Sequence, residues 1–97
     1  MAERRYRLRG YLDFESGDAL RADLLAVVNE TSDDLVLDAA ELEFIDSYGI
    51  AVIAQMRRLL GVHDRRLRIV NLRAPQRRPF EVLGLGDYLD IGESEDE

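Results

Sequence analysis

The strongest constraint on the fold is a strand-to-helix passage in the middle of the chain. Residues 35–38 read Leu-Val-Leu-Asp, and a continuous apolar run of this kind is typical of a strand covered by helices on both faces. Residues 39–45 are expected to form a short loop. Asp46 and Ser47 are good N-cap residues, and the apolar segment 50–56 that follows favours a helix. The passage therefore predicts a buried strand, a loop and a helix.

The start of this helix is the first candidate for a functional site. Unpaired N–H groups in the first helical turn favour negative charge nearby. A phosphate on Ser47 would add roughly two negative charges and three acceptor oxygens at this point. The same surface would then present a neutral hydroxyl in one state and a dianion in the other. The alternative is that Asp46 or Ser47 only caps the helix, a contribution of about 1 kcal/mol.

The residues around this helix start resemble a known family, the STAS domain. This fold is shared by anti-sigma factor antagonists and the cytoplasmic tails of sulfate transporters. The antagonists carry a motif similar to Asp-Ser-Ser/Thr-Gly-Leu after a strand that ends in Asp, and here residues 46–50 read Asp-Ser-Tyr-Gly-Ile. The resemblance extends from Gly10 to about Leu89. It implies an α/β STAS fold, with a small mixed β-sheet and helices packed mainly on one face.

The resemblance also implies roles for individual residues. Ser47 matches the serine that a partner kinase phosphorylates, and Asp46 matches the acidic residue beside it. Asp13 lies in a segment similar to the family's Gly-Glu-Leu-Asp turn, whose Asp contributes to the partner surface, or else it only bonds to nearby backbone. Tyr48 replaces the usual Ser or Thr, so its ring can contact a partner or hinder a kinase fitted to a small residue. The expected partner-binding set is Asp13, Asp46, Ser47, Tyr48 and Gly49, and no catalytic residue is expected.

The function implied by the resemblance is that of an anti-sigma factor antagonist. Its unphosphorylated form is expected to bind an anti-sigma factor with serine-kinase activity and so free a sigma factor. The alternative is a STAS subunit that docks permanently on a transporter ATPase, similar to those in bacterial lipid-trafficking complexes. Antagonists usually begin with a further strand, whereas nine residues precede Gly10. An open sheet edge that forms a homodimer, or that accepts a strand from a partner, is therefore a further hypothesis.

Composition excludes several other classes of function. A length of 97 residues predicts a single domain over 1–91, with an acidic, disordered tail over 92–97. The chain has no apolar run of about 20 residues and no signal segment, so a cytoplasmic protein without a membrane span is expected. Because there is no cysteine and one histidine, we expect no metal and no cofactor. A net charge of −7 argues against nucleic acid as a partner. Ser47 and His63 lie too far apart along one helix for the histidine to activate the serine as a nucleophile.

Hydrophobic periodicity predicts the remaining elements. Alternation over 4–9 indicates a strand that Gly10 breaks, and a helix capped by Ser16 or Asp18 follows. The other expected elements are an apolar helical stripe at Leu20, Leu24, Val27 and Val28, a helix over 47–60 stopped by Gly61, a strand over 67–72, and a helix opened by Ala74 and Pro75. Core contacts from Phe80, Val82, Leu83 and Leu85 are expected after it, followed by a short terminal turn or helix over 87–91.

Overall fold

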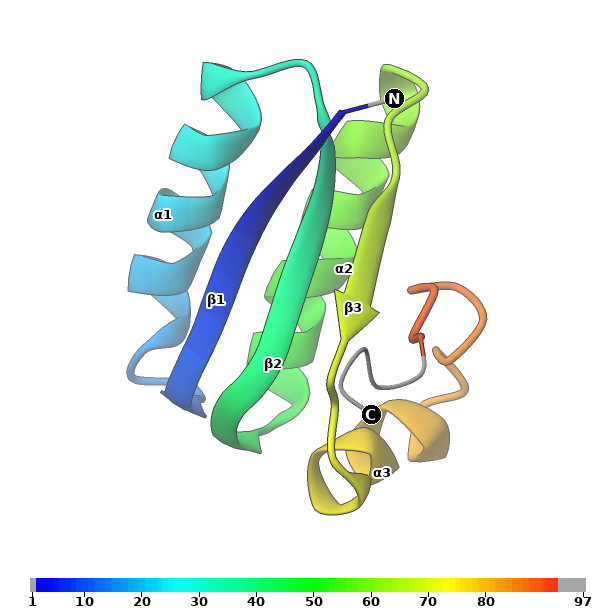
Figure 1. Ribbon diagram of the computed structural model, residues 1–97. Helices are drawn as coiled ribbons and strands as arrows, with labels where there is room; N and C mark the ends of the chain where they lie inside the picture. The colour runs from blue at the N-terminus through cyan, green and yellow to red at the C-terminus, as the bar shows by residue number, and fades with distance from the viewer. Residues whose placement is uncertain (1, 93–97) are drawn as a thin grey trace.

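Three strands and three helices alternate along the chain in a computed structural model that describes residues 2–92. In order they are β1 (Glu3–Leu12), α1 (Gly17–Glu30), β2 (Asp34–Ile45), α2 (Ser47–Val62), β3 (Leu67–Val70) and α3 (Ala74–Val82). The sheet order is β1-β2-β3, and both pairings are parallel where a mixed sheet was expected. Figure 1 shows α1 and α2 behind one face of the sheet, with α3 near the end to which the strands point. The architecture is the expected α/β arrangement.

The core lies between the sheet and the two long helices. The expected apolar stripes face inward, and Val27 is the one member of the first stripe that stays partly exposed. Because a helix repeats every 3.6 residues, side chains three and four apart reach the same face. The central buried side chains are Leu20, Leu24 and Val28 from α1, Ile53, Met56 and Leu60 from α2, and Leu8, Leu37 and Ile69 from the sheet.

β1 and β2 are both longer than the sequence predicted. The expected loop over 39–45 continues β2, and the expected break at Gly10 is absent, so that Leu12 pairs with Ile45. Gly10 has a φ of 66°, and the register between the strands shifts next to it. Such an irregularity bends a strand without ending its pairing. A bent pair of strands lacks a regular two-residue alternation of apolar and polar side chains. For this reason the sequence pattern over residues 39–45 predicted a loop.

The face of the sheet away from α1 and α2 is covered by arginine side chains rather than by a helix. Val36 is buried although it lies on this face, and its neighbours in the parallel register are Arg5 and Arg68. Arg5 lies 3.2 Å from the carboxylate of Asp38, and Arg68 lies 3.4 Å from that of Glu3. The expectation of helices on both faces of this strand is therefore wrong, since the long arginine stems cover apolar surface and keep their charged ends in water.

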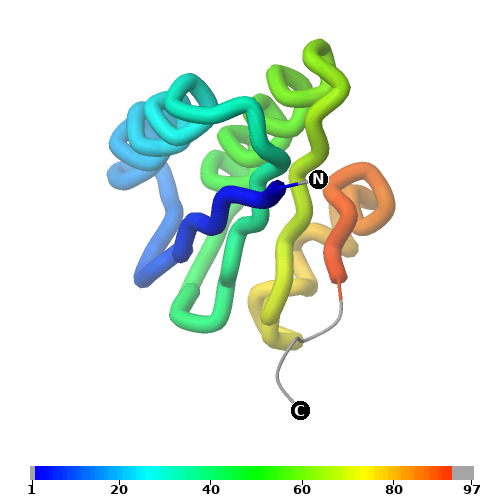
Figure 2. Tube along the Cα trace, turned by 45° about the horizontal axis from the view of Figure 1, so that its top comes forward, coloured from blue at the N-terminus to red at the C-terminus, as the bar shows by residue number. Residues whose placement is uncertain are grey.

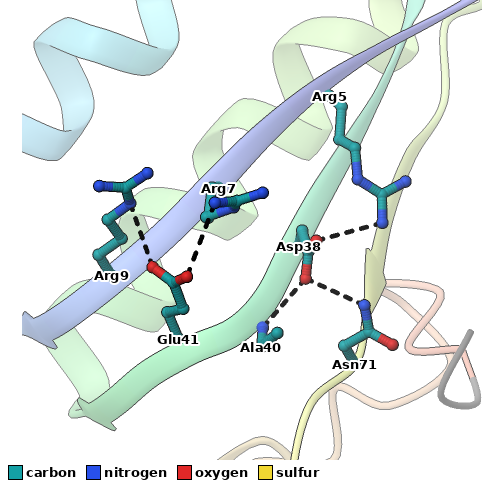
Figure 3. A network of polar contacts seen from close by, with 7 residues as sticks. All are labelled: Arg5, Arg7, Arg9, Asp38, Ala40, Glu41 and Asn71. Carbon is teal, nitrogen blue, oxygen red and sulfur yellow. Dashed lines mark hydrogen bonds and ion pairs between the residues drawn. The ribbon is translucent and has the colours of Figure 1, made fainter. Parts of the chain in front are cut away.

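Asp38 is the centre of the polar network on this face, which Figure 3 shows at close range. Its carboxylate accepts hydrogen bonds from the Ala40 N–H and the Asn71 amide, both at 3.0 Å, and from the Arg5 guanidinium at 3.2 Å. Burial opposes ionisation of Asp38, but these hydrogen bonds outweigh it and hold its pKa below the ordinary value. The same figure shows Glu41 between the arginines at positions 7 and 9.

Two element boundaries differ from expectation for local reasons. α2 passes through Gly61 to Val62, and the chain turns at Asp64, which has a φ of 58°. β3 ends at Val70 instead of continuing to residue 72, because Asn71 takes a φ of 63° and turns its side chain towards the sheet. Asn and Asp adopt this left-handed conformation more readily than other non-glycine residues.

The segment after α3 extends the sheet beside β3. Figure 2 shows the segment after α3 returning towards β3. Ile91 there forms a parallel bridge to Ile69, after the expected turn, and the N–H of Gly92 donates to the Ile69 carbonyl at 2.8 Å. Within residues 2–92 the outer edge of β1 has no strand partner, so the homodimer remains a prediction. The expected tail beyond Gly92 lies outside the described residues.

Candidate functional site

The expected site residues gather at the end of the sheet to which the strands point. Leu12 and Ile45, the last residues of β1 and β2, lie side by side, and the N–H of Asp46 donates to the Leu12 carbonyl at 3.1 Å. Asp13 directly follows Leu12, so it is brought next to the start of α2. Parallel strands carry the residues that follow them to one common edge of a sheet, which is where ligand and partner sites of α/β proteins form.

Asp46 is the N-cap of α2. Its Oδ1 accepts hydrogen bonds from the N–H groups of Tyr48 and Gly49 at 2.9 and 3.1 Å, and its carbonyl accepts from the Ile50 N–H at 3.0 Å. Two of the unpaired N–H groups at this helix start are thereby satisfied by one carboxylate oxygen. Asp46 therefore caps the helix, and this cap does not require the hydroxyl of Ser47.

Ser47 is exposed in the first turn of α2. Among residues 2–92 its hydroxyl has no hydrogen-bond partner, because Asp46 carries the cap. The side chain lines a groove whose opposite wall is α3. A group that approaches from solvent can therefore reach the Ser47 oxygen without displacing an internal contact.

Tyr48 turns towards α1, away from the side on which Ser47 meets α3. Its ring lies over Gly17, where the Cβ atom of any larger residue would collide with the ring carbons Cδ2 and Cε2. The ring centroid is 5.7 Å from that of Phe14 and 5.8 Å from the guanidinium carbon of Arg21. Tyr48 is half-buried by these contacts. It therefore joins the two helices and leaves the approach to Ser47 open.

The hydroxyl of Tyr48 extends this contact to Asp18 in the first turn of α1. It donates to Asp18 Oδ1 at 2.6 Å, and the Arg21 guanidinium donates to the same oxygen at 2.9 Å. These two hydrogen bonds, with Tyr48 the larger influence, hold the pKa of Asp18 below its ordinary value. Asp18 was considered only as a helix cap from the sequence, and its contact with Tyr48 is a property of the folded chain.

Gly49 allows α2 to approach the end of β1 closely. A Cβ atom at this position would lie 2.6 Å from the Leu12 carbonyl oxygen and 2.9 Å from Cγ1 of Ile45. Because the first of these neighbours is backbone, no side-chain movement could make room. The glycine in the motif is thus explained by packing between the helix start and the two strand ends.

Asp13 organises the loop between β1 and α1. Its Oδ1 accepts from the N–H groups of Glu15 and Ser16 at 3.0 and 3.2 Å. The Ser16 hydroxyl accepts from the Asp13 N–H at 3.0 Å and donates to the Tyr11 carbonyl at 2.6 Å, and Ser16 makes no side-chain cap for α1. Asp13 therefore bonds to nearby backbone as a turn residue does, and its contribution to a partner surface stays a prediction.

Several exposed apolar residues near this edge were not predicted from the sequence, and two of them were expected in the core. Val82 and Leu83 were expected in the core, but they are 74% and 50% exposed, whereas Phe80 is buried. Val82 lies two residues beyond Phe80 and therefore on a different side of α3, and Leu83 is the C-cap residue that follows the helix. Tyr11 and Phe44 form an exposed pair, with ring centroids 5.9 Å apart. Helical spacing in the sequence could have separated Phe80 from Val82.

Metal binding finds no support in the described part of the chain. Residues 2–92 contain no group of three or more His, Cys, Asp or Glu side chains arranged to hold an ion. His63 is exposed directly after α2. In the same range, every helix is too short or too polar to cross a membrane.

The family can be assigned once this geometry is compared with known proteins. A family model described as "Mlab, STAS domain" matches residues 2–91. The chain belongs to the STAS domain family. An anti-sigma F factor antagonist from Paenibacillus polymyxa is 27% identical over 90 residues, which cover 92% of this chain and 77% of that protein.

Solved structures confirm the STAS fold. The anti-sigma factor antagonist SpoIIAA in its unphosphorylated form matches with a TM-score of 0.81 and 22% identity, over 97% of this chain and 81% of that one. The phosphorylated form of SpoIIAA from Bacillus matches with a TM-score of 0.72 and 23% identity, over 97% and 84%. A sulfate transporter family protein from Wolinella succinogenes gives 0.79 and 18%, over 97% and 79%.

Proposed function

We propose that this STAS domain is an anti-sigma factor antagonist, a binding protein that is switched by phosphorylation of Ser47. Its partner is an anti-sigma factor with serine-kinase activity, which the unphosphorylated chain sequesters so that a sigma factor is freed. The proposal rests on the exposed Ser47 hydroxyl, which has no hydrogen-bond partner within residues 2–92 because Asp46 caps the helix. The antagonist from Paenibacillus polymyxa supports the choice of partner.

The switch follows from the position of Ser47 in the first turn of α2. In the free protein a phosphate there is favourable, since negative charge near a helix N-terminus contributes about 0.3–1 kcal/mol. In a packed interface the same dianion loses water without gaining a matching partner, which costs several kcal/mol. Phosphorylation is therefore expected to leave the free fold stable and to break the complex.

The neighbouring residues have distinct parts in this proposal. Asp46 and Gly49 fix the position of the helix start, and Asp13 fixes the loop beside it. Tyr48 stands where the family has a small residue, but its ring packs on α1 and does not cover Ser47. Together with the exposed parts of Asp13 and Tyr48, Ser47 forms the partner surface in this proposal.

The test is to purify the chain from its native cells under several growth conditions and map phosphate by mass spectrometry. Recombinant chain is then titrated by calorimetry with the anti-sigma factor kinases encoded in the same genome. Ser47→Ala is expected to bind like the wild type and to resist release by ATP. Ser47→Asp is expected to bind at least roughly tenfold more weakly, and Ser47→Asn serves as its uncharged control. Equal binding of all variants, with no phosphate on Ser47, would contradict the proposal.

A second candidate is a constitutive STAS subunit that docks on a transporter ATPase through the same helix start. It is favoured by the family model, whose description is Mlab and not anti-sigma factor antagonist. This candidate predicts a stable complex with an ATPase and an unmodified Ser47 under all growth conditions. The same phosphate mapping, combined with identification of the co-purified protein, separates the two functions.

A further inference from the structure

An apolar groove runs between the first turns of α2 and the side of α3, directly beside Ser47. Its volume is about 350 Å³. Its lining includes Ser47, Ile50, Pro75, Arg78, Val82 and Leu83. The outer wall is held in place because Gln76 in α3 donates to the Glu43 carbonyl at 2.9 Å, which ties the helix to the end of β2. The groove is therefore part of the folded surface rather than a gap that a loose helix could close.

The walls of this groove include large apolar side chains that are exposed to solvent. Val82 is 74% exposed and Leu83 is 50% exposed, and both border the opening. Exposed apolar side chains scattered singly are ordinary, but a contiguous patch around a concave site marks a binding surface. Burial of such side chains against an apolar partner would be favourable in proportion to the area removed from water.

Among the described residues that line the groove, Arg78 alone carries a positive charge. Among residues 2–92 it has neither a hydrogen bond nor an ion pair, whereas Arg5 and Arg68 on the sheet are held by carboxylates. Within residues 2–92 the lining contains no Asp or Glu that could neutralise it. A guanidinium beside an apolar groove is complementary to a carboxylate next to an apolar side chain.

We propose that this groove binds a segment of the partner protein that carries apolar side chains beside a Glu or Asp. The apolar side chains enter between Ile50 and Val82, and the carboxylate pairs with Arg78. This inference rests on the proposed function for the identity of the partner, and it adds the chemistry by which the partner is recognised. It also gives the switch a local mechanism: a phosphate on Ser47 would repel the carboxylate and compete with it for Arg78.

The test uses methyl NMR of the full chain with capped tripeptides, so it does not depend on knowing the partner. The probes are acetyl-Leu-Leu-Glu-amide, acetyl-Leu-Leu-Lys-amide and acetyl-Ser-Ser-Glu-amide. The first is expected to shift the methyl signals of Ile50, Val82 and Leu83 in a saturable way. It should bind roughly two- to fivefold more tightly than the lysine peptide, as expected for an exposed ion pair. The serine peptide should bind most weakly.

Matched variants assign the effect to individual residues. Arg78→Gln is expected to remove the preference for the glutamate peptide, whereas Arg58→Gln, the same change on exposed α2 surface, should keep it. Val82→Asp is expected to abolish binding, and Val62→Asp is the control because Val62 is 75% exposed at the far end of α2. Equal affinity for the glutamate and lysine peptides, or equal shifts at Val62, would overturn the proposal.

The link to Ser47 has its own comparison. Ser47→Asp should weaken binding of the glutamate peptide relative to Ser47→Asn, because only the former places a charge beside Arg78. Equal binding by these two variants would overturn the proposed mechanism of the switch. Since the peptides are independent of any anti-sigma factor, a groove that passes this test would stand even if the titrations with anti-sigma kinases fail. If the anti-sigma kinases bind but the peptides do not, the proposed partner stands and the groove is rejected.

Discussion

The hydroxyl of Tyr48 donates a 2.6 Å hydrogen bond to Oδ1 of Asp18 and so joins the first turns of α2 and α1. Tyr48→Phe removes this bond but keeps the ring. The pKa of Asp18 is expected to rise towards its ordinary value of about 3.9, because Tyr48 is the largest influence that lowers it. Carbon-detected NMR titration of the Asp18 carboxyl measures the change. An unchanged pKa in Tyr48→Phe would show that the hydrogen bond is not formed in solution.

Gly49 and Gly61 lie in the same helix and provide a matched pair of alanine substitutions. Gly49→Ala is expected to destabilise the fold by about 2–4 kcal/mol, because the new Cβ would collide with the Leu12 carbonyl. At Gly61 the nearest atom is 3.9 Å away, in the Arg57 side chain, so Gly61→Ala should stabilise by about 0.5–1 kcal/mol. Urea unfolding measures both, and equal effects would contradict the close packing at Gly49.

Asp46 is expected to stabilise α2 through its cap, independently of any partner. Asp46→Ala should lower the free energy of unfolding by about 0.5–2 kcal/mol, the usual cost of losing an N-cap. Asn caps helices about as well as Asp, so Asp46→Asn should have little effect. If Asp46→Asn unfolds as readily as Asp46→Ala in thermal and urea melts, the carboxylate charge matters more than the cap. The Asn variant is also the proper control for any loss of partner binding.

The buried carboxylate of Asp38 predicts a dependence of stability on pH. Its pKa in the folded state lies below the ordinary value of about 3.9, so its ionised form stabilises the fold. This contribution is fully present above about pH 5 and is lost as the pH falls through the lowered pKa. Asp38→Asn should therefore cost about 1–3 kcal/mol at pH 7, and the difference from wild type should shrink below pH 4. A difference that does not change with pH would contradict this account.

The sequence was informative about the site wherever a short-range rule applies. The helix start at Asp46 and Ser47 and the proline that opens α3 both follow from helix-end chemistry. The same motif led to the STAS family, which the match over residues 2–91 confirms. These features depend on a few neighbouring residues, so they survive in the one-dimensional pattern.

The boundaries that were wrong depend on contacts between distant segments. β2 continues to Ile45 because β1 pairs with it through a shifted register, and β3 stops where Asn71 bonds to Asp38. No local pattern encodes a partner strand or a side chain that lies more than thirty residues away.

The sequence by itself determined the family, the alternation of strands and helices, and a helix start that Asp46 or Ser47 caps. Only the tertiary structure decided that Tyr48 faces α1, that Ser47 faces α3, and that Arg78 borders the groove between α2 and α3. The physical reason is that helix propensity and capping act within a few residues. The direction of a side chain and the shape of a groove are instead set by packing among elements brought together by the whole fold.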